Sequence, residues 1–362
     1  MLKKLLLLTT CSLLIVACAQ SPTGRRQIML FNDAELGKMG AQTFETMKAE
    51  TPIAKDIKLN SYVKCVANSL LAVTPDNLRA QSWEVVVFDS DQVNAFALPG
   101  GYLGIHLGLI SVVTTRDELA SVMAHELSHV TQRHISRSMG DQARMTPWLI
   151  GAMILGMLAA SKSAQGAQAM IVGGQAMAAQ SQLNFSRDME READRIGYGV
   201  MSEAGFDTLG FVTMFGKLQQ AAGLNDSGSF PYLRSHPLSS ERMADMQSRQ
   251  QLQTPRPANL ESDLIQAMMS SRARVLAQPG VDALRAWANE AADTHIDKQV
   301  LTKRMGVLYG AALSWMQLRD MAQARALIPR MQQAAGDHAT ALRLIRLFES
   351  ELAFKEDDMR AA

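Results

Sequence analysis

Two histidines and a glutamate have the spacing that binds a divalent metal in many hydrolases. The segment reads His125-Glu126-Leu127-Ser128-His129. A helix turns once in about 3.6 residues, so the two imidazoles point the same way and can reach one ion. Glu126 then lies beside the ion, where it can accept a proton from water. The motif predicts a zinc site with His125 and His129 as ligands and Glu126 as general base.

A catalytic zinc site has about three protein ligands and an open position, so the chain must supply another ligand. The best candidate segment is residues 185–194, in which Glu190 and Asp194 lie four apart on a predicted helix. Glu190 can bind the metal, while Asp194 can orient a ligating histidine through its second ring nitrogen. Taken alone, this charged segment would be a solvated helix face. Beside the first motif it indicates a ligand.

The histidine motif needs a helix that holds both rings on one side. Thr115 and Glu118 form a predicted capping box at the start of such a helix, and apolar residues follow at helical spacing. Upstream, the patterns predict two helices and then three short strands, over residues 33–49, 54–73, 83–88, 93–98 and 102–107. The expected fold is α+β and mainly helical, with one small β-sheet before the motif.

Four further histidines lack a metal-ligand spacing. His134 lies five residues past His129, so it is predicted to face another side of the helix, either at the surface or behind a ligand. His106 lies in a predicted strand, and His295 and His338 lie in the helical C-terminal region.

The N-terminus has the layout of a secretory signal. Lys3 and Lys4 precede an apolar stretch too short for a stable membrane span, which ends at Ile15-Val16-Ala17-Cys18. This ending resembles the lipobox of bacterial lipoproteins, which implies cleavage after residues 1–17 and lipidation of Cys18; an ordinary secretory signal is the alternative. Because Ala19 is not aspartate, sorting to the outer membrane is expected by analogy.

Composition narrows the function further. The chain has 36 Lys plus Arg and 35 Asp plus Glu, a net charge of +1, and no basic stripe with interleaved aromatics. These features give no reason to expect a nucleic-acid partner. With Cys11 in the signal and Cys18 lipidated, Cys65 has no partner for a disulfide. It is predicted to be a small buried residue in a helix.

Residues 148–160 are almost all apolar. The run is shorter than the roughly 20 residues that a membrane span needs, so a buried or groove-covering helix is favoured over a membrane segment. The small residues over 166–179 suggest a mobile connection.

The composition changes near Gln253. Thr254-Pro255-Arg256-Pro257 reads as a linker, and a helical region follows. Within it, five residues match the offsets of a tetratricopeptide unit, with a turn at 318–320: Leu308, Ala312, Trp315, Ala324 and Ile328. A further helix over 339–354, a turn at 356–358 and the start of a partner helix are predicted. The expected division is a signal (1–17), a peptidase domain (18–252) and a tetratricopeptide-like helical domain (253–362). Because the last predicted repeat is only half present, this helical domain is expected to be incomplete.

Four motifs now stand in order: residues 94–101, the histidine motif, Ser186-Arg187 leading into Glu190 and Asp194, and Ser235-His236-Pro237 with Arg242. Together they resemble the HtpX and CAAX-prenyl-protease class of zinc metallopeptidases. The likeness is closest to its periplasmic subgroup, which contains the β-barrel assembly-enhancing proteases. The resemblance covers about residues 32–250 and implies a zincin-like metallopeptidase fold.

The resemblance implies roles at matching positions. Glu190 corresponds to the third zinc ligand and Asp194 to the carboxylate behind a ligating histidine. A strand at the edge of the cleft, to which a substrate peptide can add as a further strand, is formed by Asn94, Ala95, Phe96, Ala97 and Leu98.

Two more positions gain a role in this way. Arg242 corresponds to an arginine that stabilises the oxyanion, and His236 to a histidine that can fill the open zinc position as a switch ligand and hold the enzyme shut. The expected catalytic residues are therefore Glu126, Arg242 and His236. One Zn²⁺ per chain is the expected cofactor.

The sequence thus predicts a zinc-dependent endopeptidase that is lipid-anchored in the periplasm. The resemblance implies misfolded or stalled envelope proteins as substrates, and the helical tail suggests contact with the outer-membrane assembly machinery. The rival hypothesis is a periplasmic chaperone or assembly factor with a latent zinc site. A membrane-embedded protease would require residues 148–160 to enter the bilayer.

Overall fold

The computed structural model describes residues 18–20, 26–28, 32–75, 82–140, 187–223, 230–254, 256–257, 259–277 and 279–361. The predicted signal, the apolar run at 148–160 and the small-residue connection at 166–179 lie outside these residues. Within the described part of the chain, no helix combines the length and apolar character needed to cross a membrane.

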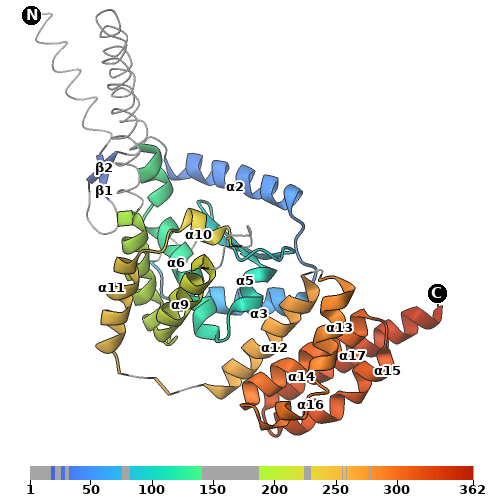
Figure 1. The fold of residues 1–362 in the computed structure, drawn as a ribbon. Coiled ribbons are helices and arrows are strands. Elements are labelled where there is room, and N and C mark those ends of the chain that lie inside the picture. The colour runs from blue at the N-terminus through green and yellow to red at the C-terminus, as the bar shows by residue number, and fades with distance from the viewer. Residues whose placement is uncertain are drawn as a thin grey trace, which may run out of the picture.

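The elements follow one another as β1 (Cys18–Gln20), β2 (Arg26–Ile28), α2 (Asp33–Glu50), α3 (Ile57–Leu71), β3 (Glu84–Phe88), β4 (Ala95–Leu98), β5 (Tyr102–His106), α5 (Leu107–Val112), α6 (Arg116–Thr131), α9 (Leu209–Gly223), α10 (Tyr232–Ser235), α11 (Ser240–Gln251), α12 (Leu260–Leu276), α13 (Val281–Glu290), the 3-10 helix η1 (Thr294–Lys298), α14 (Leu301–Gln317), α15 (Met321–Ala326), α16 (Ile328–Ala335) and α17 (Ala339–Ala361). Helices also cover residues 134–140 and 187–203. The fold is mainly helical with a small sheet, as predicted (Figure 1).

Three strands form the sheet that lies next to α6. Their order is β3-β5-β4, with β5 parallel to β3 and antiparallel to β4. Gly100 and Gly101, both with positive φ, make the turn between β4 and β5, which Pro99-Gly100-Gly101 predicted. The strand β4 is at one edge of this sheet and packs against α6.

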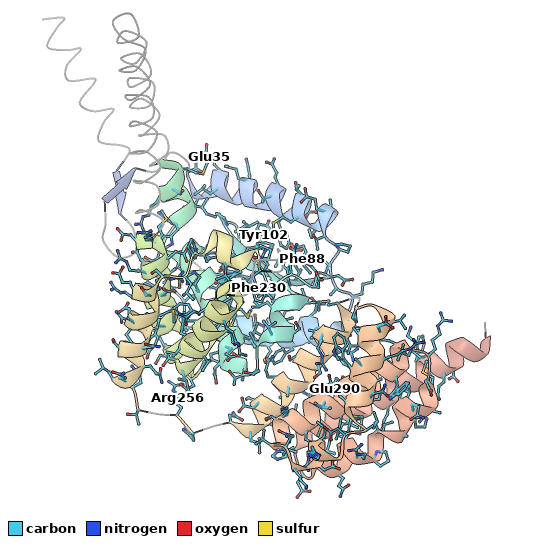
Figure 2. All side chains as sticks on the ribbon, viewed as in Figure 1. Glu35, Phe88, Tyr102, Phe230, Arg256 and Glu290 are labelled. Carbon is cyan, nitrogen blue, oxygen red and sulfur yellow. The ribbon has the colours of Figure 1, made fainter. Side chains whose placement is uncertain are left out.

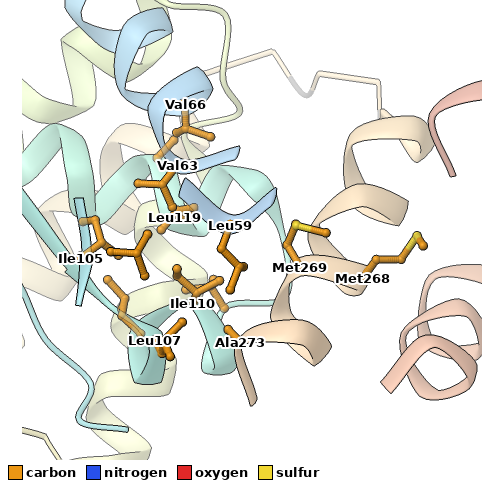
Figure 3. Close-up of a cluster of buried hydrophobic side chains, with 14 of the residues drawn as sticks. Leu59, Val63, Val66, Ile105, Leu107, Ile110, Leu119, Met268, Met269 and Ala273 are labelled. Atoms are coloured by element: carbon orange, nitrogen blue, oxygen red, sulfur yellow. The ribbon is translucent and has the colours of Figure 1, made fainter. Parts of the chain in front are cut away.

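One apolar core joins the N-terminal half to the helical tail. Figure 3 shows side chains from α3, β5, α5 and α6 meeting those of α12. Its labelled members are Leu59, Val63, Val66, Ile105, Leu107, Ile110, Leu119, Met268, Met269 and Ala273. The helix α12 therefore packs on the sequence-predicted peptidase domain as well as on its own neighbours in the tail.

A buried ion network reinforces this junction. Arg272 of α12 is 1% exposed, and its Nε lies 2.9 Å from Asp56, the residue that caps α3. Its Nη2 lies 2.9 Å from Glu351 of α17, which also pairs with Lys58 at 2.7 Å. Two helices of the tail and the start of α3 thus share one group of charges.

The connection from α11 to α12 also contacts the N-terminal half. Arg256, labelled in Figure 2, donates from Nη2 to the carbonyl of Ser202 at 2.8 Å.

The turn predicted at 318–320 is confirmed, and Arg319 adopts a φ of 63° there. The turn predicted at 356–358 is wrong, since α17 continues to Ala361. No glycine or proline interrupts that helix, and Glu356 is held by Arg325 at 2.6 Å.

Cys65 is exposed, so its predicted burial is wrong. The residue lies within α3, whose buried positions include Val63, Val66, Ala67 and Leu70. Helical periodicity places residue 65 on the opposite side of the helix from this apolar stripe.

Candidate metal centre

The histidine motif lies on the buried helix α6. Thr115 Oγ1 accepts from Glu118 N–H at 3.1 Å, which confirms half of the predicted capping box. The Glu118 carboxylate instead accepts from Thr114 N–H and from Lys217 Nζ, both at 2.6 Å. The start of α6 is therefore held by a cap and by an ion pair whose carboxylate is buried, which fixes the helix that carries His125 and His129.

A second helix, over 187–203, lies directly against α6. The contact depends on Gly197, because a Cβ at that position would come within 3.0 Å of the His125 backbone nitrogen. This close approach brings Glu190 and Asp194 beside the two histidines of α6. The two motifs singled out in the sequence thus meet in one site.

Four potential ligands gather there: His125, His129, Glu190 and His236. Their ligand atoms all lie within 4.8 Å of one another. Nε2 of His125 is 3.0 Å from Nε2 of His129 and 3.3 Å from Oε2 of Glu190. Nδ1 of His236 is 3.0 Å from Oε1 of Glu190. Among the described residues this is the group of nitrogen and oxygen donors that fits a transition metal such as zinc.

The electrostatics of the group favour a positive charge at its centre. Burial opposes protonation of His125, but hydrogen bonds to Asp194 and Glu190 raise its pKa to about 10. Burial works against ionisation of Glu190, yet His125 and His236 hold its pKa well below the usual range. Burial lowers the pKa of His129 well below its usual value. A cation among these donors would take the place of the proton on His125, so the residues fit a metal ion.

Asp194 and Arg242 lie behind the ligands. Oδ1 of Asp194 is 2.9 Å from Nδ1 of His125, the second ring nitrogen of a potential ligand. Arg242 contacts Asp194 through Nε at 2.7 Å and Nη2 at 2.8 Å. Its Nη1 is 2.9 Å from Glu190 and donates to the carbonyl of Pro237 at 2.8 Å. Both residues are buried, so Arg242 compensates two carboxylates at once.

His236 lies between the ligands and Glu126. Its Nε2 is 3.4 Å from Oε1 of Glu126, while its Nδ1 is on the side of Glu190. The ring packs on Tyr232, with centroids 4.6 Å apart. The backbone N–H of Tyr232 donates to the carbonyl of Val93, just before β4. The segment that carries His236 is thereby attached to the start of the edge strand.

Sequence reasoning missed Tyr232. Burial and the charges of Glu126 and Glu190 raise the pKa of this phenol well above its usual value, and its side chain is hydrogen-bonded to Glu126. Its spacing of four residues from His236 was the available signal, because residues four apart can share a side of a helical turn.

Of the two positions predicted for His134, the one at the surface is wrong. The structure places His134 behind a potential ligand. The helix α6 ends at Thr131, and Arg133 adopts a left-handed φ of 56°. This turn brings the His134 ring to His129, with the two Nδ1 atoms 2.9 Å apart. Five-residue spacing within one continuous helix could not place it there.

The predicted edge strand is β4, preceded by Asn94. The carbonyl of Asn94 accepts from His106 N–H at 3.1 Å, so residues 94, 96 and 98 make the bonds to β5. The alternation of the ladder directs the N–H and C=O of Ala97 away from β5. The side chain of Asn94 accepts from Ala95 N–H at 3.0 Å. The outer edge of β4 therefore presents backbone groups beside α6.

A model of peptidase family M48 matches residues 58–250. This range begins in α3, includes the sheet, α6 and the helix that carries Glu190, and ends in α11.

Comparison of the whole chain with known proteins finds similar bacterial proteins. The chain is 32% identical over 295 residues to the putative beta-barrel assembly-enhancing protease of Vibrio cholerae, which covers 81% of this chain and 59% of that protein. It is 32% identical over 302 residues to the beta-barrel assembly-enhancing protease of Yersinia pestis, covering 83% and 60%. The Escherichia coli K12 protein of the same name is 30% identical over 314 residues, covering 85% and 61%. The chain spans about three fifths of the length of these relatives.

Proposed function

The chain belongs to peptidase family M48, and from this premise we propose that it is a zinc-dependent endopeptidase of the bacterial cell envelope. The observation that carries the proposal is the group of buried His125, half-buried His129 and buried Glu190, with buried Glu126 beside it on α6. Two imidazoles and one carboxylate form a ligand set typical of catalytic zinc, which keeps a further position open for water or substrate.

The chemistry divides between the metal and the side chains. When bound, zinc supplies Lewis acidity that activates water and polarises a peptide carbonyl. Glu126 accepts the proton of the attacking water on its carboxylate and delivers it to the leaving nitrogen. Asp194 holds His125 in the orientation that turns Nε2 toward the other ligands. Arg242 already contacts two carboxylates and a carbonyl, so it acts on the developing oxyanion through the field of its buried charge.

His236 restrains the enzyme in this proposal. Its Nδ1 belongs to the same group of donor atoms as the three proposed ligands, and its Nε2 faces Glu126. An imidazole in that position competes with water for the open ligand position and with substrate for the general base. Cleavage then requires the segment that carries His236 to move away from α6.

Substrate binding and localisation complete the proposal. An extended peptide adds to the outer edge of β4, where the backbone groups of Ala97 are directed outward. Residues 253–362 serve as a tetratricopeptide-like domain that contacts the outer-membrane assembly machinery. The similar proteins are named for enhancing β-barrel assembly, which supports misassembled envelope proteins as substrates. The predicted lipid on Cys18 would anchor the chain to the outer membrane from the periplasm.

A second candidate function is a periplasmic assembly factor whose metal site is latent. The extensive docking of α12 on the peptidase core favours it, because the tail is built into the molecule rather than loosely attached. Glu126→Gln separates the two functions in cells: a binding protein keeps its role in this variant, whereas a protease loses it.

The direct test is cleavage of casein by residues 19–362 purified with zinc. We expect slow cleavage by the wild type, a loss of at least about 100-fold in Glu126→Gln because the general base is removed, and faster cleavage by His236→Ala. His295→Ala, which changes an exposed histidine of the tail, is the matched control and should equal the wild type.

The outcomes separate the parts of the proposal. Full activity of Glu126→Gln would refute the assignment of the general base. A decrease in His236→Ala would refute the restraint and leave the peptidase standing. Zinc binding without cleavage by any variant would favour the assembly factor.

A further inference from the structure

A second buried histidine lies directly behind a proposed ligand. His134 is 2% exposed, and its Nδ1 is 2.9 Å from Nδ1 of His129. On its other side, Nε2 lies 3.4 Å from Oε2 of Glu192, which comes from the helix that supplies Glu190. Glu192 in turn accepts from Nη1 of Arg137 at 2.6 Å. All three of these outer side chains are buried.

The contact between the two imidazoles defines where their protons lie. Two ring nitrogens 2.9 Å apart cannot both present lone pairs, so one Nδ1 carries a hydrogen. Nε2 of His129 faces His125 and Glu190, and as a metal ligand it must be unprotonated. The hydrogen is therefore on Nδ1 of His129, and Nδ1 of His134 accepts it. The remaining proton of a neutral His134 is on Nε2, which faces the carboxylate of Glu192.

This assignment gives each contact in the series from His129 through His134 and Glu192 to the buried Arg137 one donor and one acceptor. It parallels the arrangement at the other histidine of the motif, where Oδ1 of Asp194 lies 2.9 Å from Nδ1 of His125 and Asp194 is itself held by Arg242. A ligating imidazole is generally oriented, and its basicity raised, by an acceptor on its second nitrogen. The carboxylate of Asp194 fills that position for His125 directly. For His129 the position is filled by His134.

We propose that His134 is a positioning residue for the metal site: it accepts a hydrogen bond from Nδ1 of His129, faces the carboxylate of Glu192 through Nε2, and fixes the ring that offers Nε2 to the metal. The inference rests on the proposed function, because it takes His129 as a metal ligand. One helix would then support the site with three carboxylates. Glu190 is a ligand, Glu192 lies behind His134, and Asp194 lies behind His125.

Zinc affinity measured by competition with a chelator tests the proposal without relying on catalysis. His134→Leu removes the acceptor and should weaken zinc binding by about 10- to 100-fold. In His134→Asn, Oδ1 can stand near the former Nδ1 and accept from His129, so the affinity should return to within a few-fold of the wild type. His106→Leu is the matched control, since His106 is also buried but packs against Phe88 and Phe96, and its zinc affinity should not change.

A nitrogen-15 correlation spectrum of the histidine rings in the zinc-loaded wild type gives a readout that needs no variant. The proposal requires His134 to be neutral with its hydrogen on Nε2, and His129 to carry its hydrogen on Nδ1. A hydrogen on Nδ1 of His134 would overturn it.

The outcomes distinguish this inference from the proposed function. If the wild type binds no zinc, the ligand assignment fails. If the wild type binds zinc and His134→Leu binds it equally well, or His134→Asn is as weak as His134→Leu while both fold, the positioning role fails. A change in melting temperature of the apoprotein with unchanged zinc affinity would mark His134 as structural and also contradict the proposal.

Discussion

At the scale of residues, the site depends on buried carboxylates that each meet a partner of opposite charge. Asp194 and Glu190 are 1% and 3% exposed, and both contact the buried guanidinium of Arg242. Burial alone would raise the pKa of Asp194, but Arg242 and His125 lower it. An ionised carboxylate that loses its partner in such surroundings is costly. Arg242 therefore contributes to stability as well as to the chemistry.

Replacing Arg242 by Ala should lower the free energy of unfolding of the apoprotein by about 3–5 kcal/mol, because Asp194 and Glu190 would remain buried with less compensation. Urea unfolding monitored by circular dichroism measures this change. Arg195→Ala is the control: Arg195 is half exposed, pairs with Asp245, and should contribute at most about 1 kcal/mol. Equal stability of the wild type and Arg242→Ala would contradict this charge compensation and leave only an effect on the reaction.

At the scale of elements, the arrangement places β4, α6 and the helix over 187–203 around one site. The sheet order puts β4 at an edge, and the alternation of its ladder leaves the Ala97 N–H directed away from β5. If a substrate peptide adds to this edge, that N–H is one of its donors.

Ala97→Pro removes that donor and spares the bonds that residues 96 and 98 make to β5. One lost hydrogen bond is worth about 1 kcal/mol, so KM for a peptide substrate should rise roughly five-fold with little change in kcat. Steady-state kinetics on a fluorogenic peptide checks this, with melting temperature as a control for the sheet. An unchanged KM in a folded variant would exclude strand addition at this edge.

The elements that the sequence predicted well are those with local signals. The capped start of α6 and the glycine turn after β4 depend on residues within a few positions of one another. The end of α6 was harder, because Arg133 has no local feature that requires a positive φ. The position of His134 follows from that turn, and its partner Glu192 lies 58 residues further along the chain.

At the scale of the whole molecule, the helical tail is part of the framework around the site. Thr254, Arg256 and Pro257 of the predicted linker are non-helical, yet the core continues from α3 and α5 into α12. Sequence patterns could not reveal this packing. The partners of Arg272 lie 216 residues before it and 79 after it, and no local spacing links them.

Arg272→Ala should therefore destabilise the whole chain by about 3–5 kcal/mol, because it leaves Asp56 and Glu351 without their buried partner. Calorimetry should show both regions still unfolding in one transition, at a lower temperature. Arg325→Ala removes a more exposed pair with Glu356 and should cost at most about 1 kcal/mol. Two separate transitions in the wild type would contradict the shared core.

The central claim is that His125, His129 and Glu190 bind one zinc ion, and metal analysis of the purified chain tests it most directly. Residues 19–362 dialysed against zinc and then against buffer should retain close to one equivalent of zinc. Glu190→Gln should retain much less, whereas Glu203→Gln, an exposed change on the same helix, should match the wild type. A wild type without zinc, or a folded Glu190→Gln that keeps its full equivalent, would contradict the account.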